Sequence, residues 1–191
     1  MRLPERSPQN ASAPACDVLA LVSPPVALLD TPLDFILADH FRQRSLLAAL
    51  RCIAETGLVG RREADALLTF LTGDYTLHHQ DEELDLFPAL RRRALPEDAL
   101  DAALSRLLED HRHAEPLIAK LVSALRAAET ADPVRLDAGT CAAMQDFAQG
   151  EHRHLAIENG IVLALARARL TRGDLRRISQ NMKARRGVAA G

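Results

Sequence analysis

The sequence predicts an all-α protein: an up-down-up-down four-helix bundle with an irregular N-terminal lead-in and a short C-terminal helix. Hydrophobic residues make up 48% of the 191 residues and aromatic residues only 3%, so the core must consist mainly of Leu, Ala, Ile and Val. Such a composition favours helices over strands. Apolar residues also recur in three- and four-residue steps over long segments, and the short connections between these segments favour antiparallel neighbours.

The charge balance gives no indication of a nucleic-acid or membrane-surface partner. The formal net charge is −2, and the basic residues gather at Arg91–Arg93 and between Arg176 and Arg186. Cations of the first group complement the dipole at the C-terminal end of a helix, so we interpret them as structural. We therefore expect neither nucleic acid nor a membrane among the partners.

Three cysteines, Cys16, Cys52 and Cys141, are widely spaced and form no Cys-x-x-Cys motif. An odd number of isolated thiols favours a reducing compartment over a disulfide framework. The apolar stretch from Val18 to Leu29 contains two prolines and is too short to span a bilayer. It also lacks a clear signal-peptide cleavage site, so we expect a cytoplasmic protein.

The chain divides into three expected parts. Residues 1–30 carry five of the ten prolines and form the irregular N-terminal segment. Residues 31–170 form the four-helix bundle, and residues 171–191 form a short basic helix and tail.

The first helix is expected from Thr31, an N-cap followed by Pro32 at the first helical position, to about Gly57. His40 lies on its apolar face among leucines. Taken alone, a histidine in such a place is more often a buried, hydrogen-bonded residue than a metal ligand.

A second helix is expected from Arg61 to Arg93, and it carries a histidine and a carboxylate one turn apart. Its inner stripe consists of Leu67, Leu71, Tyr75, His78, Glu82, Leu86 and Ala89. His78 and Glu82 therefore face the interior, where side chains at i and i+4 can hold one metal ion. His79 and Glu83 share the spacing but fall on the neighbouring flank. A solvated charged face is the alternative, and the apolar residues around His78 and Glu82 argue against it.

A third helix is expected from Pro96 to Thr130, with His111 and Glu115 as an inward-facing pair. His113 falls off this stripe. Pro116 should kink the helix, because it removes a backbone donor and crowds a carbonyl.

A fourth helix is expected from Asp132 to Leu170, opened by a cap and a proline like the first. His154 and Glu158 repeat the spacing of the second helix, and Glu151 lies one turn earlier on the same stripe. Glu151 is a candidate acceptor for the free N–H of a ligand, whereas His152 lies off the stripe.

Four histidines and three carboxylates thus face the interior: His40, His78, Glu82, His111, Glu115, His154 and Glu158. They exceed the four ligands of one zinc ion and suit two octahedral ions bridged by carboxylates, with positions left for water or a small molecule. Nitrogen and oxygen ligands without thiolate favour iron, with manganese or a mixed pair and then zinc as alternatives. A metal-free network is the structural alternative, but burying so many ionisable groups without an ion would be strongly destabilising.

This pattern resembles the hemerythrin-like (HHE cation-binding) domains over residues 31–170. Three parts of the sequence match the first, third and fourth helices of the family: His40 in Ala-Asp-His-Phe-Arg, His111 in Glu-Asp-His-Arg, and His154 with Glu158-Asn159. In the second helix, the family's ligand glutamate lies five residues before the Phe of Leu-Phe-Pro. The resemblance therefore selects Glu82, and with it His78 rather than His79.

Two departures from the oxygen-carrying hemerythrins make this sequence more similar to bacterial HHE proteins and iron-cluster-repair proteins. Those carriers have a second histidine in the third helix, where this chain has Glu115, and their fourth-helix histidine and carboxylate are five residues apart rather than four. The cysteine-containing N-terminal domain of many repair proteins is absent from this sequence. A third carboxylate would favour ferric iron, so the resemblance implies redox chemistry or sensing more than reversible oxygen carriage.

The resemblance implies a non-heme di-iron protein that binds or reacts with O2, NO or peroxide at a carboxylate-bridged site. An oxidoreductase or an iron-cluster-repair enzyme is the first alternative, since Glu115 and Glu151 offer extra acid–base or ligand groups. A signalling or partner-binding module whose surface depends on the metal state is the second. The sequence leaves open whether the protein is an enzyme and which oligomeric state it adopts.

Overall fold

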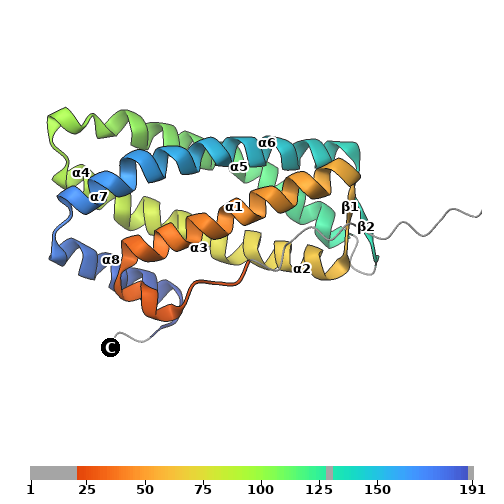
Figure 1. The fold of residues 1–191 in the computed structure, drawn as a ribbon, viewed down its shortest axis with the longest axis horizontal. Coiled ribbons are helices and arrows are strands. Elements are labelled where there is room, and N and C mark those ends of the chain that lie inside the picture. Colours follow the sequence, from red (N-terminus) through yellow and green to blue (C-terminus); the bar gives the residue numbers. More distant parts are fainter. Residues whose placement is uncertain (1–20, 128–130, 189–191) are drawn as a thin grey trace, which may run out of the picture.

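The computed structural model describes residues 21–127 and 131–188, which form a bundle of four long helical segments, so the predicted all-α fold is confirmed. Figure 1 shows the segments lying along the long axis of the molecule, each reversing the direction of the one before. The bundle brings residues from distant parts of the sequence into one shared interior.

The first segment is α1 (Pro32–Thr56), and its boundaries are those predicted. Pro32 occupies the first helical position, and Gly57 ends the helix with a φ of 64°, a left-handed conformation that glycine adopts without steric cost. Within the expected lead-in, Val26–Asp30 form a short 3₁₀ helix, η1. The rest of the lead-in up to residue 20 lies outside the described residues.

The second segment runs without a break over the predicted residues 61–93 but is not a uniform α-helix. In chain order it consists of α2 (Arg61–Thr69), η2 (Phe70–Asp74), α3 (Tyr75–Asp81), η3 (Glu82–Leu86) and α4 (Phe87–Arg93). The elements η2 and η3 are π-helical turns, which hold more residues per turn than the 3.6 of an α-helix. The side chains after each turn therefore point in directions that a regular helix would not give them.

The third segment is α5 (Leu100–Ala127), which contains Pro116 in its interior. It begins at Leu100 rather than at Pro96, because a short 3₁₀ turn, η4 (Pro96–Asp98), precedes it. Its predicted C-terminal residues 128–130 lie outside the described residues.

The fourth segment consists of α6 (Ala138–Ile157), η5 (Glu158–Val162) and α7 (Leu163–Arg169), and η5 is again a π-helical turn. The prediction that it begins at Asp132 is wrong.

The residues after Asp132 form a strand instead of a helical turn. Strand β2 (Val134–Arg135) pairs antiparallel with β1 (Leu58–Val59) at one end of the bundle. Asp137 then caps α6, because its side chain accepts the backbone N–H of Thr140 at 2.6 Å.

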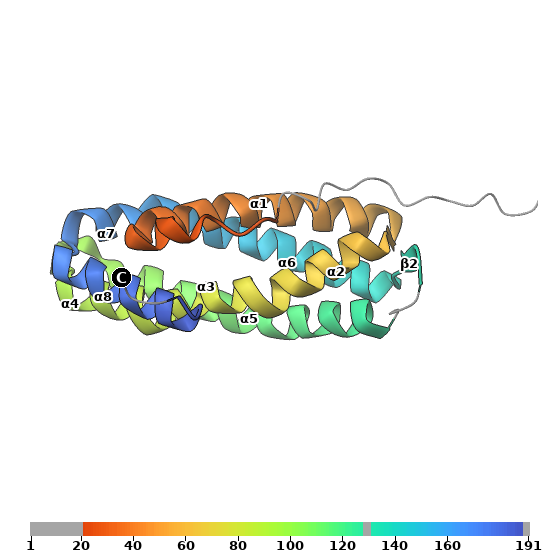
Figure 2. The ribbon, with the colours of Figure 1, turned by 90° about the horizontal axis from the view of Figure 1, so that it is seen from below.

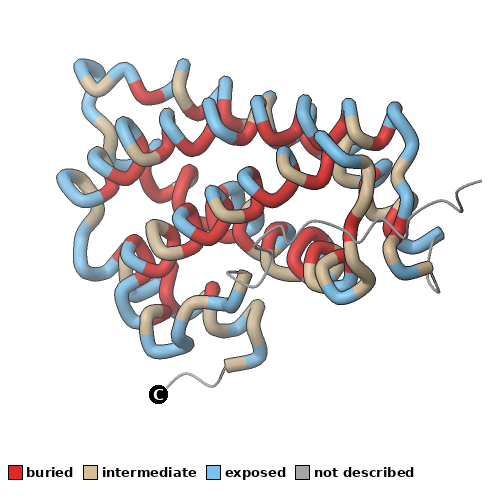
Figure 3. The backbone as a smooth tube through the Cα atoms, turned by 45° about the vertical axis from the view of Figure 1, so that its right-hand side comes forward, coloured by how far each residue is buried: buried red, intermediate tan, exposed pale blue. Residues whose placement is uncertain are grey.

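Two hydrophobic clusters fill the bundle, one on each side of a buried polar layer. Along α1, Ile36 belongs to one cluster and Leu47 to the other, with the buried His40 between them. Along α5, Leu107 and Ala114 flank His111 in the same way. Figure 3 shows the buried residues facing the shared interior of the bundle. The polar layer is therefore enclosed by apolar packing above and below it.

A further helix, α8 (Arg172–Arg185), packs against α1, α3 and η3 (Figure 2). Its first turn is capped by Thr171, whose hydroxyl accepts the backbone N–H of Asp174 at 3.2 Å. The basic C-terminal end is not a solvated tail: Arg185 and Arg186 lie 2.9 and 2.7 Å from the carboxylate of Asp81, which is only 1% exposed. This ion-pair network fixes α8 to the helix that carries His78 and Glu82.

The expectation of isolated thiols concerns residues of which the structure describes only a part. Cys141 is a free thiol, and Cys16 lies outside the described residues. Within the described part of the chain, no helix combines the length and the apolar character that a bilayer span needs.

Candidate metal centre

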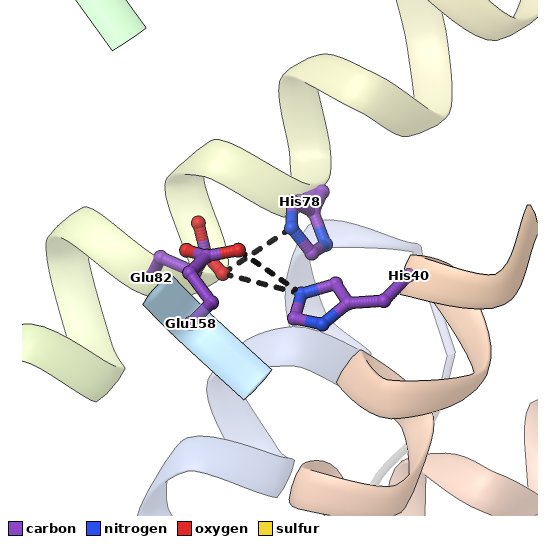
Figure 4. A group of neighbouring side chains, drawn as sticks. All are labelled: His40, His78, Glu82 and Glu158. Atoms are coloured by element: carbon purple, nitrogen blue, oxygen red, sulfur yellow. Dashed lines mark ion pairs between the residues drawn. The ribbon is translucent and has the colours of Figure 1, made fainter. Parts of the chain in front are cut away.

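Six of the seven predicted ligands come together in the polar layer between the two hydrophobic clusters. They form two groups of potential metal ligands, within each of which the ligand atoms lie within 4.8 Å of one another: His40, His78, Glu82 and Glu158, and Glu82, His111, His154 and Glu158. All six residues are buried, with exposed fractions of 1–2%. Figure 4 shows the first group, in which the histidines of α1 and α3 face the two glutamates. His40 and His78 form one histidine pair, and His111 and His154 form the other. Both pairs face the carboxylates of Glu82 and Glu158.

The two glutamates divide their oxygens between the two histidine pairs. Glu82 places Oε1 3.2 Å from His78 Nε2 and Oε2 3.5 Å from His111 Nε2. Glu158 places Oε2 3.2 Å from His40 Nε2 and Oε1 3.1 Å from His154 Nε2. Two cis ligands, each about 2.1 Å from one metal ion, stand about 3 Å apart, so these separations match the edges of a coordination polyhedron.

Both glutamates begin a π-helical turn, which keeps the residues that follow them on the buried face. On a regular α-helix, consecutive four-residue steps drift off one face, because a turn holds 3.6 residues. In η3 and η5 the wider turn lets Glu82 and then Leu86, and likewise Glu158 and then Val162, stay on the buried face. Each His-x3-Glu pair is therefore followed by an apolar residue four positions later that is also buried.

The outer nitrogen of each histidine faces an oxygen acceptor, so the inner nitrogen faces the glutamates. His40 Nδ1 lies 3.2 Å from Asn159 Oδ1, and His111 Nδ1 lies 2.6 Å from Glu83 Oε1. Oxygen accepts an N–H, so each ring carries a hydrogen on Nδ1 and points Nε2 inward. This is the orientation in which histidines bind metal ions, with the other ring nitrogen donating to an acceptor.

The second histidine of each pair faces an aspartate, at hydrogen-bond distance for His78 and at ion-pair distance for His154. Asp39 Oδ2 lies 3.0 Å from His78 Nδ1, and Asp110 Oδ2 lies 3.9 Å from His154 Nδ1. Asp39 is held in turn by Arg42 at 2.5 Å, and Asp110 by Arg106 at 3.0 Å.

The same arrangement occurs in both halves of the bundle. The first half contains His40, His78 and Glu82, and the second half contains His111, His154 and Glu158. The aspartate before the first histidine of each half faces the second histidine of that half, as Asp39 and Asp110 do. The residue after the glutamate of each half faces the first histidine of the other half, as Glu83 and Asn159 do. The sequence carries this signal as Asp-His and as a polar residue after each glutamate, but residue spacing alone did not identify it.

The carboxylates of the centre favour the protonated form of the histidines that face them. Burial disfavours the charged form of His40, but Glu158 and Glu82 outweigh burial and raise the pKa of His40 to about 9. Glu82 and Asp39 likewise raise the pKa of His78 well above its ordinary value against the effect of burial. Burial raises the pKa of Glu82, but His78 and the other histidines outweigh it and lower the pKa well below its usual range. The carboxylates are therefore ionised and attract positive charge.

Several buried atoms of the centre lack hydrogen-bond partners, as expected for atoms that bind metal ions. His40 Nε2, His78 Nε2 and both carboxylate oxygens of Glu82 and Glu158 are buried without a hydrogen-bond partner of good geometry. Buried polar atoms are normally satisfied, so six such atoms in one buried layer fit the binding of cations. Imidazole and carboxylate donors suit iron, manganese or zinc.

The predicted place of Glu115 is wrong, because its side chain is exposed rather than inside the bundle. Along α5 the buried stripe passes from His111 to Ala114, a step of three residues, so that Glu115 lies one position beyond the buried face. It borders a groove of about 690 Å³ between α3 and α5, together with His79 and Glu83. His113 and His152 are exposed, as predicted.

His79, which the sequence placed on a flank, stacks on His111 with their ring centroids 3.7 Å apart. Burial and the neighbouring His111 lower the pKa of His79 well below its usual value, so the ring is neutral. It belongs to neither group of potential ligands, and its contact supports the orientation of His111.

Glu151 is buried as predicted but accepts its hydrogen bond from a different donor. The hydroxyl of Tyr75 donates to Glu151 Oε2 at 2.8 Å, and Oε1 has no partner. Burial raises the pKa of Glu151 against the opposing effect of His154.

Comparison with known protein families gives a match between residues 31–166 and the hemerythrin HHE cation binding domain. This range spans most of the chain and contains all six residues of the two ligand groups. A comparison with curated proteins finds no match.

Proposed function

The chain belongs to the hemerythrin HHE cation-binding domain family, and from this premise we propose a non-heme di-iron protein that takes up O2, NO or peroxide. In this proposal His40 and His78 hold one ion, His111 and His154 hold the other, and Glu82 and Glu158 bridge the two. Cation binding follows from the family, whereas the number of ions and the small molecule are our inference.

One observation carries the inference of two ions: each glutamate offers one oxygen to each histidine pair. A single ion would use one oxygen of each carboxylate and would leave a histidine pair and two oxygens buried without a partner. That arrangement is costly, because unpaired buried charge is not solvated. Two ions use all the inward-facing atoms of the centre.

The number of protein ligands supports binding of a small molecule. Two histidine nitrogens and two carboxylate oxygens give four protein ligands for each ion. Iron in nitrogen and oxygen surroundings accepts six ligands, which leaves positions for water or for O2, NO or peroxide. Ferrous iron at such a site supplies electrons to these molecules. The protein holds the ligand atoms, and the two hydrophobic clusters keep bulk water away from them.

The exposure of Glu115 changes the choice between reversible binding and redox chemistry. The expected third carboxylate would have favoured ferric iron, but the ligand groups of the structure do not include it. Without a third carboxylate, the ligands do not favour redox chemistry over reversible oxygen binding. One experiment distinguishes the two.

The test is optical. Metal-free protein is loaded with ferrous iron under anaerobic conditions, and the visible spectrum is recorded before and after exposure to O2, NO or peroxide. We expect a charge-transfer band in the wild-type protein and in His113→Ala, a matched control in which an exposed histidine is removed. The band should be absent from Glu82→Ala.

The course of that band separates the two outcomes. A band that disappears again under vacuum means reversible oxygen binding, and a band that changes irreversibly to a ferric spectrum means redox chemistry. No spectral change with any of the three molecules would contradict the proposed function.

The cytoplasmic location expected from the sequence stays a prediction.

A further inference from the structure

A polar pocket of about 320 Å³ lies between α5 and α6, beside the metal centre but outside the two ligand groups. We call it the α5–α6 pocket. Its charged lining consists of four carboxylates, a histidine and two arginines: Glu109, Asp110, Asp146, Glu151, His113, Arg106 and Arg153. Arg106 is paired with Asp110 at 3.0 Å, so negative charge exceeds positive charge among these side chains.

One carboxylate of the pocket is deeply buried and only half satisfied. Glu151 is 5% exposed, and its Oε2 accepts the hydroxyl of Tyr75 at 2.8 Å. Its Oε1 is buried without a hydrogen-bond partner. A buried carboxylate oxygen without a partner is costly unless a cation or a donor approaches it. The pocket therefore has a site for positive charge on the side that faces the protein interior.

Two lining residues connect the pocket to the metal centre. Asp110 Oδ2 lies 3.9 Å from Nδ1 of His154, a proposed ligand. Glu151 lies one turn before His154 on α6, and its electrostatic neighbours include Glu158. Negative charge therefore continues from the pocket opening to the carboxylates that we propose as bridges.

We propose that the α5–α6 pocket is the route by which divalent metal cations reach the centre, with Glu151 as the residue that receives the incoming ion. This inference rests on the proposed function. Among the described residues, the pocket carboxylates do not converge into a third ligand group. The pocket is therefore a passage and not a storage site. Carboxylates along a low-dielectric channel raise the local concentration of cations and thereby the rate of their association.

The experiment measures the rate of uptake separately from the final amount of metal. Metal-free protein is mixed with Co²⁺ in a stopped-flow instrument, and the visible bands of bound cobalt are followed. Glu151→Gln removes the charge but keeps an oxygen that can accept the Tyr75 hydroxyl. We expect uptake about tenfold slower, because focusing by fixed charge changes association rates by tenfold or more. The final stoichiometry should be unchanged.

A matched control lies on the opposite side of α5. Glu115 is an exposed glutamate of the same helix, but it borders the groove on the α3 side. Glu115→Gln should therefore take up cobalt at the wild-type rate. High salt should slow the wild-type protein more than Glu151→Gln, because salt screens the charge that attracts the ion.

A second variant tests the route by filling it. Gly150 lines the pocket, and a Cβ built there meets nothing within 4 Å. Gly150→Leu should slow uptake while the melting temperature stays the same or rises, because leucine favours the helix more than glycine does. A variant that merely damaged the fold would lower the melting temperature. Gly73→Leu, also with open space around its Cβ but in η2, is the control and should leave the rate unchanged.

The outcomes separate this inference from the proposed function. Wild-type uptake rates in both Glu151→Gln and Gly150→Leu would overturn the uptake route and leave the two-ion centre intact. An equal slowing in Glu115→Gln would also overturn it. Failure of the wild-type protein itself to bind two cobalt ions would overturn the proposed function instead.

Discussion

Glu82 and Glu158 occupy equivalent positions in the two halves of the bundle and face the same two histidine pairs. Each follows a histidine by four residues, begins a π-helical turn and is 1% exposed. Each places one oxygen within 3.5 Å of a histidine from its own half and the other oxygen within 3.5 Å of a histidine from the other half.

A first prediction concerns these bridging residues. Glu82→Ala and Glu158→Ala should each lower the content of both metal ions, because each glutamate contributes to both sites. Metal analysis of the purified protein measures the effect. His113→Ala is the control, since this exposed histidine should leave the metal content at the wild-type value. Loss of a single ion in either glutamate variant would contradict the bridging role.

A second prediction concerns Glu83, the acceptor of His111 Nδ1 at 2.6 Å. Glu83→Ala should weaken metal binding about 10- to 100-fold, the usual effect of removing the residue that orients a histidine ligand. Because the Glu83 side chain is 40% exposed, the unfolding free energy of the metal-free protein should change little.

Titration of the metal-free variant with Co²⁺ measures that affinity. Glu115→Ala is the matched control, because Glu115 lines the same groove without facing a ligand histidine. Equal affinities of the two variants would contradict the assignment of Glu83.

A third prediction concerns pH. The pKa of His40 rises from 6.5 to about 9 on folding, so its contribution to stability is complete below pH 6.5 and is lost as the pH rises through 9. The raised pKa values of His78 and His154 act in the same direction. The metal-free protein should therefore unfold at a lower denaturant concentration at pH 9.5 than at pH 6.5.

Metal ions should reverse this dependence, because they displace the protons of the histidines and bind more tightly as the pH rises. Urea titrations at both pH values, with and without metal, measure both effects. A metal-free protein that is more stable at pH 9.5 than at pH 6.5 would contradict the charge distribution described here.

A fourth prediction concerns α8. Replacing Arg185 and Arg186 with Met leaves the buried carboxylate of Asp81 without its two cations. Removing the partner of a buried charge typically costs about 3 kcal/mol or more of unfolding free energy. Urea denaturation of the metal-free protein measures this loss.

Asp81→Asn in the same background is the control for that loss. It removes the unpaired charge and should restore a large part of the stability. A triple variant as unstable as the double variant would show that the arginines act through other contacts, such as the stacking of Arg186 on Phe35.

Most of the fold followed from periodicity, because long amphipathic helices give a strong sequence signal. The boundaries failed where local chemistry competed with the pattern. Asp132 and Pro133 read as a cap, but the next residues pair as strand β2, and Asp137 provides the cap. A two-residue strand carries no periodicity that a sequence could show.

Six of the seven predicted ligands lie in the buried polar layer, and the seventh, Glu115, is exposed. Across the π turns that begin at Glu82 and Glu158, two successive four-residue steps stay buried, from His78 to Leu86 and from His154 to Val162. Through His111, α5 is a regular α-helix, so the second four-residue step carries Glu115 to the surface. No propensity of single residues predicts where a π turn forms. The residues that face the outer histidine nitrogens are Asp39, Glu83, Asp110 and Asn159. Their contacts are between helices, so the spacing of residues along one helix does not predict them.

The most direct test of the two-ion centre is anomalous X-ray diffraction from crystals of the iron-loaded protein. We predict two anomalous peaks between Glu82 and Glu158, about 3.5–4 Å apart, as in other two-metal sites. One peak should lie beside the Nε2 atoms of His40 and His78, and the other beside those of His111 and His154. A single peak, or peaks away from these side chains, would contradict the account.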